Sequence, residues 1–206
     1  MGGAGLGLAL ASLAPEARES TPERVLHIPT ARDLSNRLLE CVESLLPAER
    51  WGELGRLAVA TGPGGFTSTR LTVVFARTLA QQLELPLDGP SSFLLIARRL
   101  WQAGEAPPQP FWLVQELPRR GTVAGAYGPR AEALGGLAEL EQPWLFREPQ
   151  PWLPPQAAEP HRPALVEPEA DAAQLLALGQ LAAAADLPGP WGPVLPLYPT
   201  SPVEGL

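Results

Sequence analysis

A glycine-rich turn between an apolar segment and a helix constrains the fold more than any other feature of this sequence. Residues 57–61 form a continuous apolar run without alternation, which is typical of a strand covered on both faces. Gly62, Gly64 and Gly65 follow, and glycine permits a positive φ and a close backbone approach. The next residues, up to Leu83, carry apolar side chains at helical spacing. A buried strand, a tight turn and a helix in this order predict an α/β domain.

The predicted helices begin at short polar side chains. Thr30 to Asp33 forms a predicted capping box for a helix over 31–46, which ends before Pro47. Thr67 or Ser68 is predicted to cap the helix after the glycine turn. The remaining predicted elements are strands over 5–12 and 24–28, a helix from Ser91 or Ser92 to about 101, a hairpin of 111–117 with 122–127, a helix over 170–185 and an extended piece over 194–198.

Two segments allow a second interpretation. Residues 5–14 are apolar enough for the core of a signal peptide, but the alternation of small and large residues over 5–12 favours a packed strand. From 141 to 169 prolines are too frequent for a regular element, although Trp144 and Trp152 lie there. We expect an extended stretch that packs on the surface through its aromatic side chains. No other segment is a candidate for crossing a membrane.

Both long helices of the first half are apolar on more than one side. The helix over 31–46 has a broad apolar stripe that includes Leu39, and the helix after the glycine turn adds Val73 and Val74 opposite its main stripe. A helix that packs on one neighbour needs a narrower stripe, so these helices are expected to have two partners each.

The residue content excludes several chemistries. The chain has no lysine, so a Schiff-base lysine or a P-loop lysine is absent. The net charge is −7 and no long basic run occurs, which argues against autonomous binding of nucleic acid. Cys41 is the only cysteine, which excludes an intramolecular disulfide and favours a reducing, cytoplasmic compartment. Cys41 is interpreted as a small buried hydrophobe, and His27 and His161 as structural or solvated residues.

The glycine turn itself has two interpretations. A turn that leads into a helix N-terminus can bind an anion, because free backbone amides point outward there. Gly62 to Thr67, however, has neither the ending of a P-loop nor the spacing of a dinucleotide-binding motif. A tight turn required by packing is therefore favoured, and the residues alone point to a binding or scaffold protein without a catalytic site, cofactor or metal.

The run from Leu57 to Arg70 resembles the signature of the TsaB (YeaZ) family of bacterial tRNA threonylcarbamoyladenosine biosynthesis proteins. That signature is a hydrophobic strand followed by Gly-Pro-Gly-Ser/Gly-Phe-Thr-Gly-x-Arg and a helix. The segments 35–47, 85–92, 111–127 and 195–198 are similar to other parts of the family pattern.

This resemblance implies an α/β fold of the actin/Hsp70-like class, with two small related lobes. We place an N-terminal lobe at 1–90 and a C-terminal lobe at 91–206, the latter with the proline-rich segment 141–169. The chain starts at what resembles the family's second strand, so the first strand is expected to be missing. Ser68 stands where the family has glycine, and Gln115 with Glu116 replaces an aspartate.

The resemblance also implies a function. The chain is expected to be a non-catalytic accessory subunit of the complex that adds a threonylcarbamoyl group to the adenosine beside the anticodon, in tRNAs that read codons beginning with A. Its expected partners are a TsaD-type paralogue, as a heterodimer, and a TsaE-type ATPase, with tRNA contacted indirectly. Self-association through the same helices stays open. The candidate partner-binding residues are Leu38, Leu39, Val42, Gly64, Gly65, Phe66, Thr67, Arg70, Val73, Val74 and Arg77.

Two other functions remain as alternatives. One is a small protease or a nucleotide hydrolase of the same fold, which needs a nucleophile or a set of metal ligands. The other is a truncated interaction domain without function. Both differ from the accessory subunit in what they predict for a TsaD-type paralogue: only the accessory subunit requires a stable pair.

Overall fold

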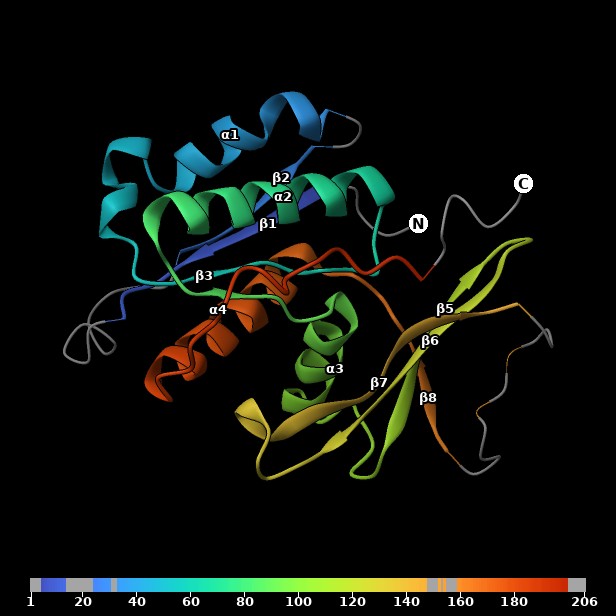
Figure 1. Ribbon diagram of the computed structural model, residues 1–206. Coiled ribbons are helices and arrows are strands. Elements are labelled where there is room, and N and C mark those ends of the chain that lie inside the picture. The colour runs from blue at the N-terminus through green and yellow to red at the C-terminus, as the bar shows by residue number, and fades with distance from the viewer. Residues whose placement is uncertain are drawn as a thin grey trace.

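The computed structural model describes residues 5–13, 24–30, 33–147, 152, 154 and 159–199. Helices and strands alternate along much of the chain (Figure 1). The elements are β1 (Gly5–Leu10), β2 (Arg24–Pro29), α1 (Leu34–Leu45), the 3₁₀ helix η2 (Ala48–Glu53), β3 (Leu57–Ala58), α2 (Phe66–Leu83), β4 (Leu87–Asp88), α3 (Ser92–Gln102), β5 (Phe111–Leu117), β6 (Gly121–Pro129), η3 (Leu134–Gly136), β7 (Leu137–Phe146), β8 (His161–Pro163) and α4 (Pro168–Ala184).

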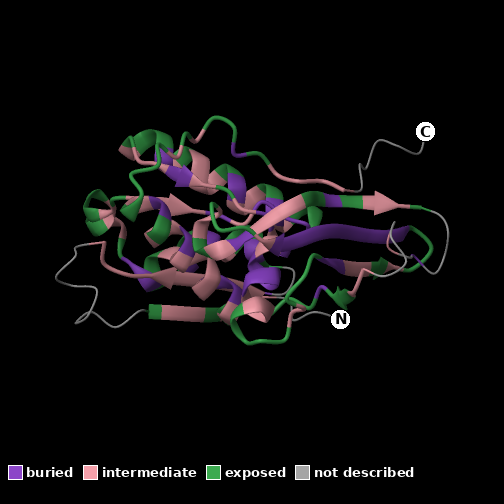
Figure 2. Cartoon of the chain, turned by 90° about the horizontal axis from the view of Figure 1, so that it is seen from below, coloured by how far each residue is buried: buried purple, intermediate pink, exposed green. Residues whose placement is uncertain are grey.

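The C-terminal sheet has four strands in the order β7-β6-β5-β8. β5 and β6 form the predicted hairpin, antiparallel from the pair Phe111 and Tyr127 to the pair Leu117 and Gly121. Residues of β6 are buried almost throughout, and Figure 2 shows this sheet's long central strand in the colour of buried residues. α3 packs against the sheet, and Phe93, Phe111 and Tyr127 belong to the shared core.

The N-terminal strands form two separate sheets of two strands each. β1 pairs antiparallel with β2, and β3 pairs parallel with β4. α1 and α2 lie on one side of these strands and α4 lies on the other (Figure 1). The backbone ladder of β3 continues past its assigned end, because Val59 N–H donates to Asp88 O at 2.9 Å and Thr61 N–H donates to Pro90 O at 2.9 Å. This pairing agrees with the strand predicted over 57–61.

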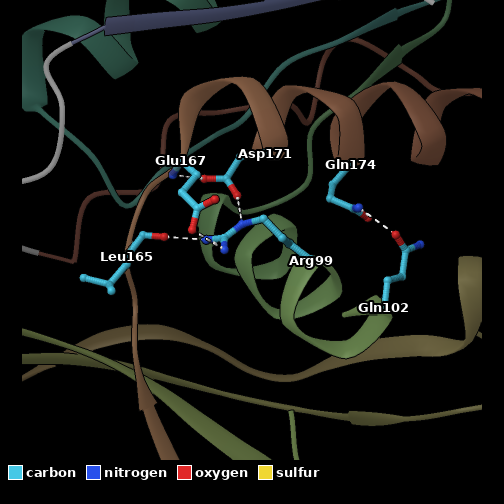
Figure 3. A network of polar contacts seen from close by, with 6 residues as sticks. All are labelled: Arg99, Gln102, Leu165, Glu167, Asp171 and Gln174. Atoms are coloured by element: carbon cyan, nitrogen blue, oxygen red, sulfur yellow. Dashed lines mark hydrogen bonds and ion pairs between the residues drawn. The ribbon is translucent and has the colours of Figure 1, made fainter. Parts of the chain in front are cut away.

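α4 joins the two halves of the molecule. It contacts β1, β2 and β3, and also α3 of the second half. Arg99 of α3 donates to the carboxylate of Asp171 at 2.8 Å and to that of Glu167 at 2.7 Å, and to Leu165 O at 2.6 Å (Figure 3). The division into lobes at residue 90 stays a prediction, and any boundary has to account for this C-terminal helix on N-terminal strands.

Two predicted caps are wrong, for different reasons. α1 begins at Leu34, and the Asp33 carboxylate accepts from Asn36 Nδ2 at 2.6 Å and makes no cap hydrogen bond. The capping box also includes residues 31 and 32, which lie outside the described residues. α2 begins at Phe66 with Gly65 as the N-cap, so Ser68 lies inside the first turn and donates to Gly65 O at 2.9 Å. The Ser91 cap is confirmed, since its hydroxyl accepts from Leu94 N–H at 3.0 Å.

The prediction that 141–169 holds no regular element is also wrong. β7 continues to Phe146, and β8 occupies His161–Pro163. Proline has no backbone N–H to donate to a neighbouring strand. Pro163 is tolerated because β8 lies at the edge of its sheet and pairs with β5 alone. The predicted aromatic packing is confirmed for Trp152, whose ring centroid lies 5.2 Å from that of Trp112 of β5, and is wrong for Trp144, which is 64% exposed.

Candidate partner interface

α1 presents one apolar side chain to solvent and buries four others. Leu34, Leu38, Cys41 and Leu45 face the interior at the spacing of one helix face, while Leu39 on the other side is 52% exposed. Leu38 is 6% exposed, so its prediction as a contact residue is corrected: it packs in this chain's own core. Val42 is partly buried between the two faces.

α2 repeats this arrangement beside α1 (Figure 1). Val73 is fully buried and belongs to the cluster with Val59 and Leu87, so it too is corrected from a contact residue to a core residue. Val74, the next residue, points the other way and is 50% exposed. Arg70, one helical turn before it, is also exposed. α1 and α2 thus each place an aliphatic side chain in water, and the arginine lies near one of them.

The glycine turn leads into this surface. Gly62 has a φ of +108°, and a Cβ there would lie 2.9 Å from Leu197 O, so only glycine fits without strain. Its carbonyl accepts from Ser92 N–H at 2.6 Å, which ties the turn to the start of α3. Gly64, Gly65 and Thr67 are exposed. The turn therefore has the packing role favoured from its sequence, with part of its backbone open to solvent.

A C-terminal segment, residues 191–198, covers the edge of α2 and the turn. Leu197 N–H donates to Thr61 O at 2.7 Å. The ring of Tyr198 stacks on that of Phe66, with centroids 4.7 Å apart. Arg77 lies over the Trp191 ring at 5.9 Å and donates to Gly192 O at 3.3 Å. Arg77 therefore holds this segment in place, and its contact with a partner stays a prediction.

The sequence contained a signal for this segment that periodicity does not detect. Trp191 and Tyr198 are large aromatic side chains in an irregular, proline-rich segment, and such side chains need a surface to pack on. Which surface they take is decided by the fold. Of the predicted contact residues, the structure brings Leu39, Val74, Arg70, Phe66, Thr67 and the exposed glycines to the outside of α1, α2 and the turn, which together we call the α1–α2 face.

Ionisable groups with shifted pKa values lie elsewhere in the molecule. Burial raises the pKa of Glu139, while hydrogen bonds from Ser91 and Tyr127 act in the opposite direction. Burial likewise raises the pKa of Asp171, against the effect of its hydrogen bond from Arg99. Burial lowers the pKa of Arg98, whose guanidinium donates to Leu134 O at 2.8 Å. These groups hold α3, α4 and the C-terminal sheet together, and none belongs to the α1–α2 face.

The described residues contain no group of three His, Cys, Asp or Glu side chains that could hold a metal ion. Cys41, interpreted from its helix position as a buried hydrophobe, is 2% exposed, which confirms that interpretation. His27 and His161 are exposed. Across the described ranges, no helix has both the length and the apolar character to span a bilayer.

Comparisons with known proteins agree on one group. Residues 27–115 match the family model of TsaD, the tRNA N6-adenosine threonylcarbamoyltransferase. The tRNA threonylcarbamoyladenosine biosynthesis protein TsaB of Escherichia coli K12 is 31% identical over 77 residues, which is 36% of this chain. The match spans about a third, 33%, of that protein's length.

Solved structures extend the likeness to nearly the whole chain. YeaZ from Pseudomonas aeruginosa has a TM-score of 0.68 at 19% identity, and a protein of that organism described as similar to peptidase YEAZ has 0.70 at 20%. Each alignment covers 95% of this chain and 94% of the other. The predicted fold class is thereby confirmed: an α/β chain with the fold of YeaZ, of the TsaD and actin-like ATPase type.

Proposed function

Since all three comparisons support its identification with the TsaB/YeaZ family, we propose that this chain is a non-catalytic accessory subunit in the synthesis of threonylcarbamoyladenosine in tRNA. In this role it pairs with a TsaD-type paralogue, which performs the transfer to the adenosine beside the anticodon. A TsaE-type ATPase acts in the same complex in the cytoplasm. The net charge of −7 fits an indirect contact with tRNA, because phosphate binding requires a basic surface.

The exposed aliphatic side chains of α1 and α2 carry this proposal. Leu39 and Val74 are each about half exposed, at 52% and 50%, on helices that the core has already stabilised from the other side. Burying them against a partner removes apolar surface from water, at about 25 cal/mol for each Å². Arg70 adds a charged group at the rim, where arginine is enriched in protein interfaces. The heterodimer surface is thus the α1–α2 face.

Co-expression with the TsaD-type paralogue of the same organism tests the proposal. The wild-type pair should co-elute in size-exclusion chromatography. Val74→Asp places a carboxylate in the apolar part of the face and should weaken pairing by about 30-fold or more, the effect of losing a hot-spot residue. Arg70→Glu should weaken it through charge reversal. Circular dichroism and thermal unfolding should show that both variants stay folded.

Leu181→Asp is the matched control. Leu181 is an apolar residue, 38% exposed, on α4, and α4 lies on the opposite side of the N-terminal strands from α1 and α2 (Figure 1). This variant should pair like the wild type. If wild-type proteins elute separately, the proposed function fails; if Val74→Asp pairs normally, only the location of the interface fails.

A catalytic alternative has no comparable support. A protease or a nucleotide hydrolase needs a nucleophile with a base, or a metal, and the described residues contain no group of three His, Cys, Asp or Glu side chains that could hold a metal ion. The Ser68 hydroxyl, near the glycine turn, donates to Gly65 O within its own helix turn. Turnover of ATP or of a peptide by the pure chain would favour that alternative.

A further inference from the structure

A stripe of exposed side chains runs along the outer side of α2. Phe66, Arg70 and Val74 follow one another at four-residue spacing, which places them on the same side of the helix. Phe66 is 43% exposed and Val74 is 50% exposed, and Arg70 is exposed between them. This stripe is the part of the α1–α2 face that α2 supplies.

The C-terminal segment of residues 191–198 runs beside this stripe. Its first aromatic ring, Trp191, lies under the guanidinium of Arg77, further along α2. Its last aromatic ring, Tyr198, stacks on Phe66 at the start of the helix. The segment therefore borders the proposed partner surface along α2, and its last part covers the first side chain of the stripe.

The chain just before this last part is built into the core. Val194 is 8% exposed and packs in one cluster with Val59 and Leu87. Five residues earlier, Gly189 O accepts from Leu87 N–H at 2.7 Å. Because these contacts join it to the strands of the N-terminal half, this part of the chain is released only when the core opens.

Residues 195–198, which we call the strap, are attached far more weakly. Leu195 is 57% exposed, and Pro196 has no N–H to donate. The strap is held by the hydrogen bond from Leu197 N–H to Thr61 O, at 2.7 Å, and by the stack of its tyrosine ring on the start of α2. One backbone hydrogen bond and one ring stack at the surface each contribute little, so the strap can open without the core.

We propose that the strap is an autoinhibitory cover, which lies closed over Phe66 in the free chain and lifts before a partner polypeptide covers the whole stripe of α2. The Tyr198 ring occupies the place beside Phe66 that a partner side chain would take. Pro196 and Pro199 leave this part of the chain few backbone donors to offer a partner, which favours a cover over a contact surface. Pairing is then weakened by the fraction of chains whose strap is closed. The inference rests on the proposed function for the identity of the partner.

Hydrogen exchange on the free chain tests whether the strap opens by itself. The amides of Leu197 and Leu87 both donate over 2.7 Å, but only the first belongs to the strap. After correction for intrinsic exchange rates, Leu197 N–H should exchange at least about 100-fold faster than Leu87 N–H, because local opening releases it. Equal protection of the two amides would overturn the proposal, since the strap would then open only together with the core.

Binding of the TsaD-type paralogue, measured by isothermal titration calorimetry, tests what the strap does. Tyr198→Ala removes the ring that closes the strap and should tighten Kd by about five- to tenfold, because the closed state no longer competes. Tyr198→Phe keeps a ring for the stack and should bind like the wild type. Leu195→Ala is the matched control: it shortens an exposed side chain of the same strap and should also leave Kd unchanged.

Two binding results would overturn the proposal. An unchanged Kd in Tyr198→Ala would show that the strap does not compete with the partner, and a weaker Kd would make the tyrosine ring part of the contact surface. If the wild-type chain does not pair at all, the proposed function fails, and the exchange of Leu197 N–H still decides whether the strap opens. Thermal unfolding should show that the three variants stay folded.

Discussion

β6 and β1 are both apolar strands, yet β6 is buried and β1 is only partly buried. β6 has a partner on each side, β5 and β7, and nearly all its residues are buried. β1 has a partner on one side, and all six of its residues are only partly buried. The contrast in Figure 2 between the long buried strand and the partly buried strands of the other half follows this difference. Burial of a strand thus depends on its neighbours as much as on its own side chains.

The same difference separates the two halves of the molecule. The C-terminal half closes one four-stranded sheet around an aromatic core, where Phe93, Phe111 and Tyr127 are at most 1% exposed. The N-terminal half divides four strands between two sheets, β1-β2 and β3-β4. Its exposed α1–α2 face suits contact with another polypeptide, whereas the C-terminal half supplies a packed support.

The largest expected effect is a truncation in the C-terminal core. Leu113 of β5 is fully buried, so Leu113→Ala removes packing and leaves a cavity, which should lower the free energy of unfolding by about 3–4 kcal/mol. Leu8→Ala in β1 should cost about 1 kcal/mol or less, because Leu8 already borders an open cavity.

Urea unfolding monitored by tryptophan fluorescence measures both variants. An equal loss of unfolding free energy in the two variants would contradict the proposed difference in packing between the two halves.

The second effect concerns the contact that joins the halves. Asp171→Ala removes acceptors for Arg99 Nε and for Glu167 N–H, both at 2.8 Å, and leaves a largely buried guanidinium with one carboxylate fewer (Figure 3). The free energy of unfolding should fall by about 2–3 kcal/mol, the usual cost of losing a charged hydrogen-bond partner.

Gln174→Ala is the control at the same junction. Gln174 donates to Gln102 at 2.7 Å in an exposed position, and its loss should change stability by less than about 0.5 kcal/mol. Hydrogen exchange of α4 should rise in Asp171→Ala and stay unchanged in the control. A similar loss in both variants would show that the ion pairs are not what holds α4 to α3.

The smallest effect is a pH dependence of the C-terminal half. Burial raises the pKa of Glu139 in the folded chain above its ordinary value of 4.5. Below that value the carboxyl is neutral in both folded and unfolded states, and its contribution to stability is fully present. As pH rises through the folded pKa, the unfolded chain ionises more readily, and that contribution is lost.

Glu139→Gln keeps an amide oxygen for Ser91 and Tyr127 and cannot ionise. The difference in unfolding free energy between wild type and this variant should therefore shift in favour of the variant as pH rises from 4.5, by at most about 1.4 kcal/mol for each unit of pKa elevation. Thermal unfolding across pH 4 to 8 measures it. A difference that does not vary with pH would show that the carboxyl titrates alike in both states.

Local patterns predicted much of the fold. Three predicted features agree with the structure: the hairpin of β5 and β6, the strand over 57–61 and the end of α2 at Leu83. They were predictable because turn glycines and hydrophobic spacing act over a few residues. The helix starts were less accurate, since Thr, Ser and Asp can hydrogen-bond in several ways near a first turn. β7 and β8 were missed, because prolines at an edge or beside a bulge cost a strand little.

The candidate face shows a similar limit. The sequence alone marked α1 and α2 as too apolar for one neighbour, and it identified the glycine turn as a feature of packing. It could not show that Val73 is buried and Val74 exposed. When apolar residues cover a broad part of a helix, the side that faces the core is known only once the strands beneath the helix are placed. It also could not show that Arg77 holds residues 191–198, which are more than a hundred positions away.

The amino-acid sequence by itself determined the main helices, the hairpin and the strand before the glycine turn, since helix and strand periods, glycine turns and the Ser91 cap act between near neighbours. It also determined the absence of lysine chemistry and of disulfides. Only the tertiary structure decided which apolar side chains stay in water and where strand edges lack partners. Both depend on contacts between segments far apart in the chain.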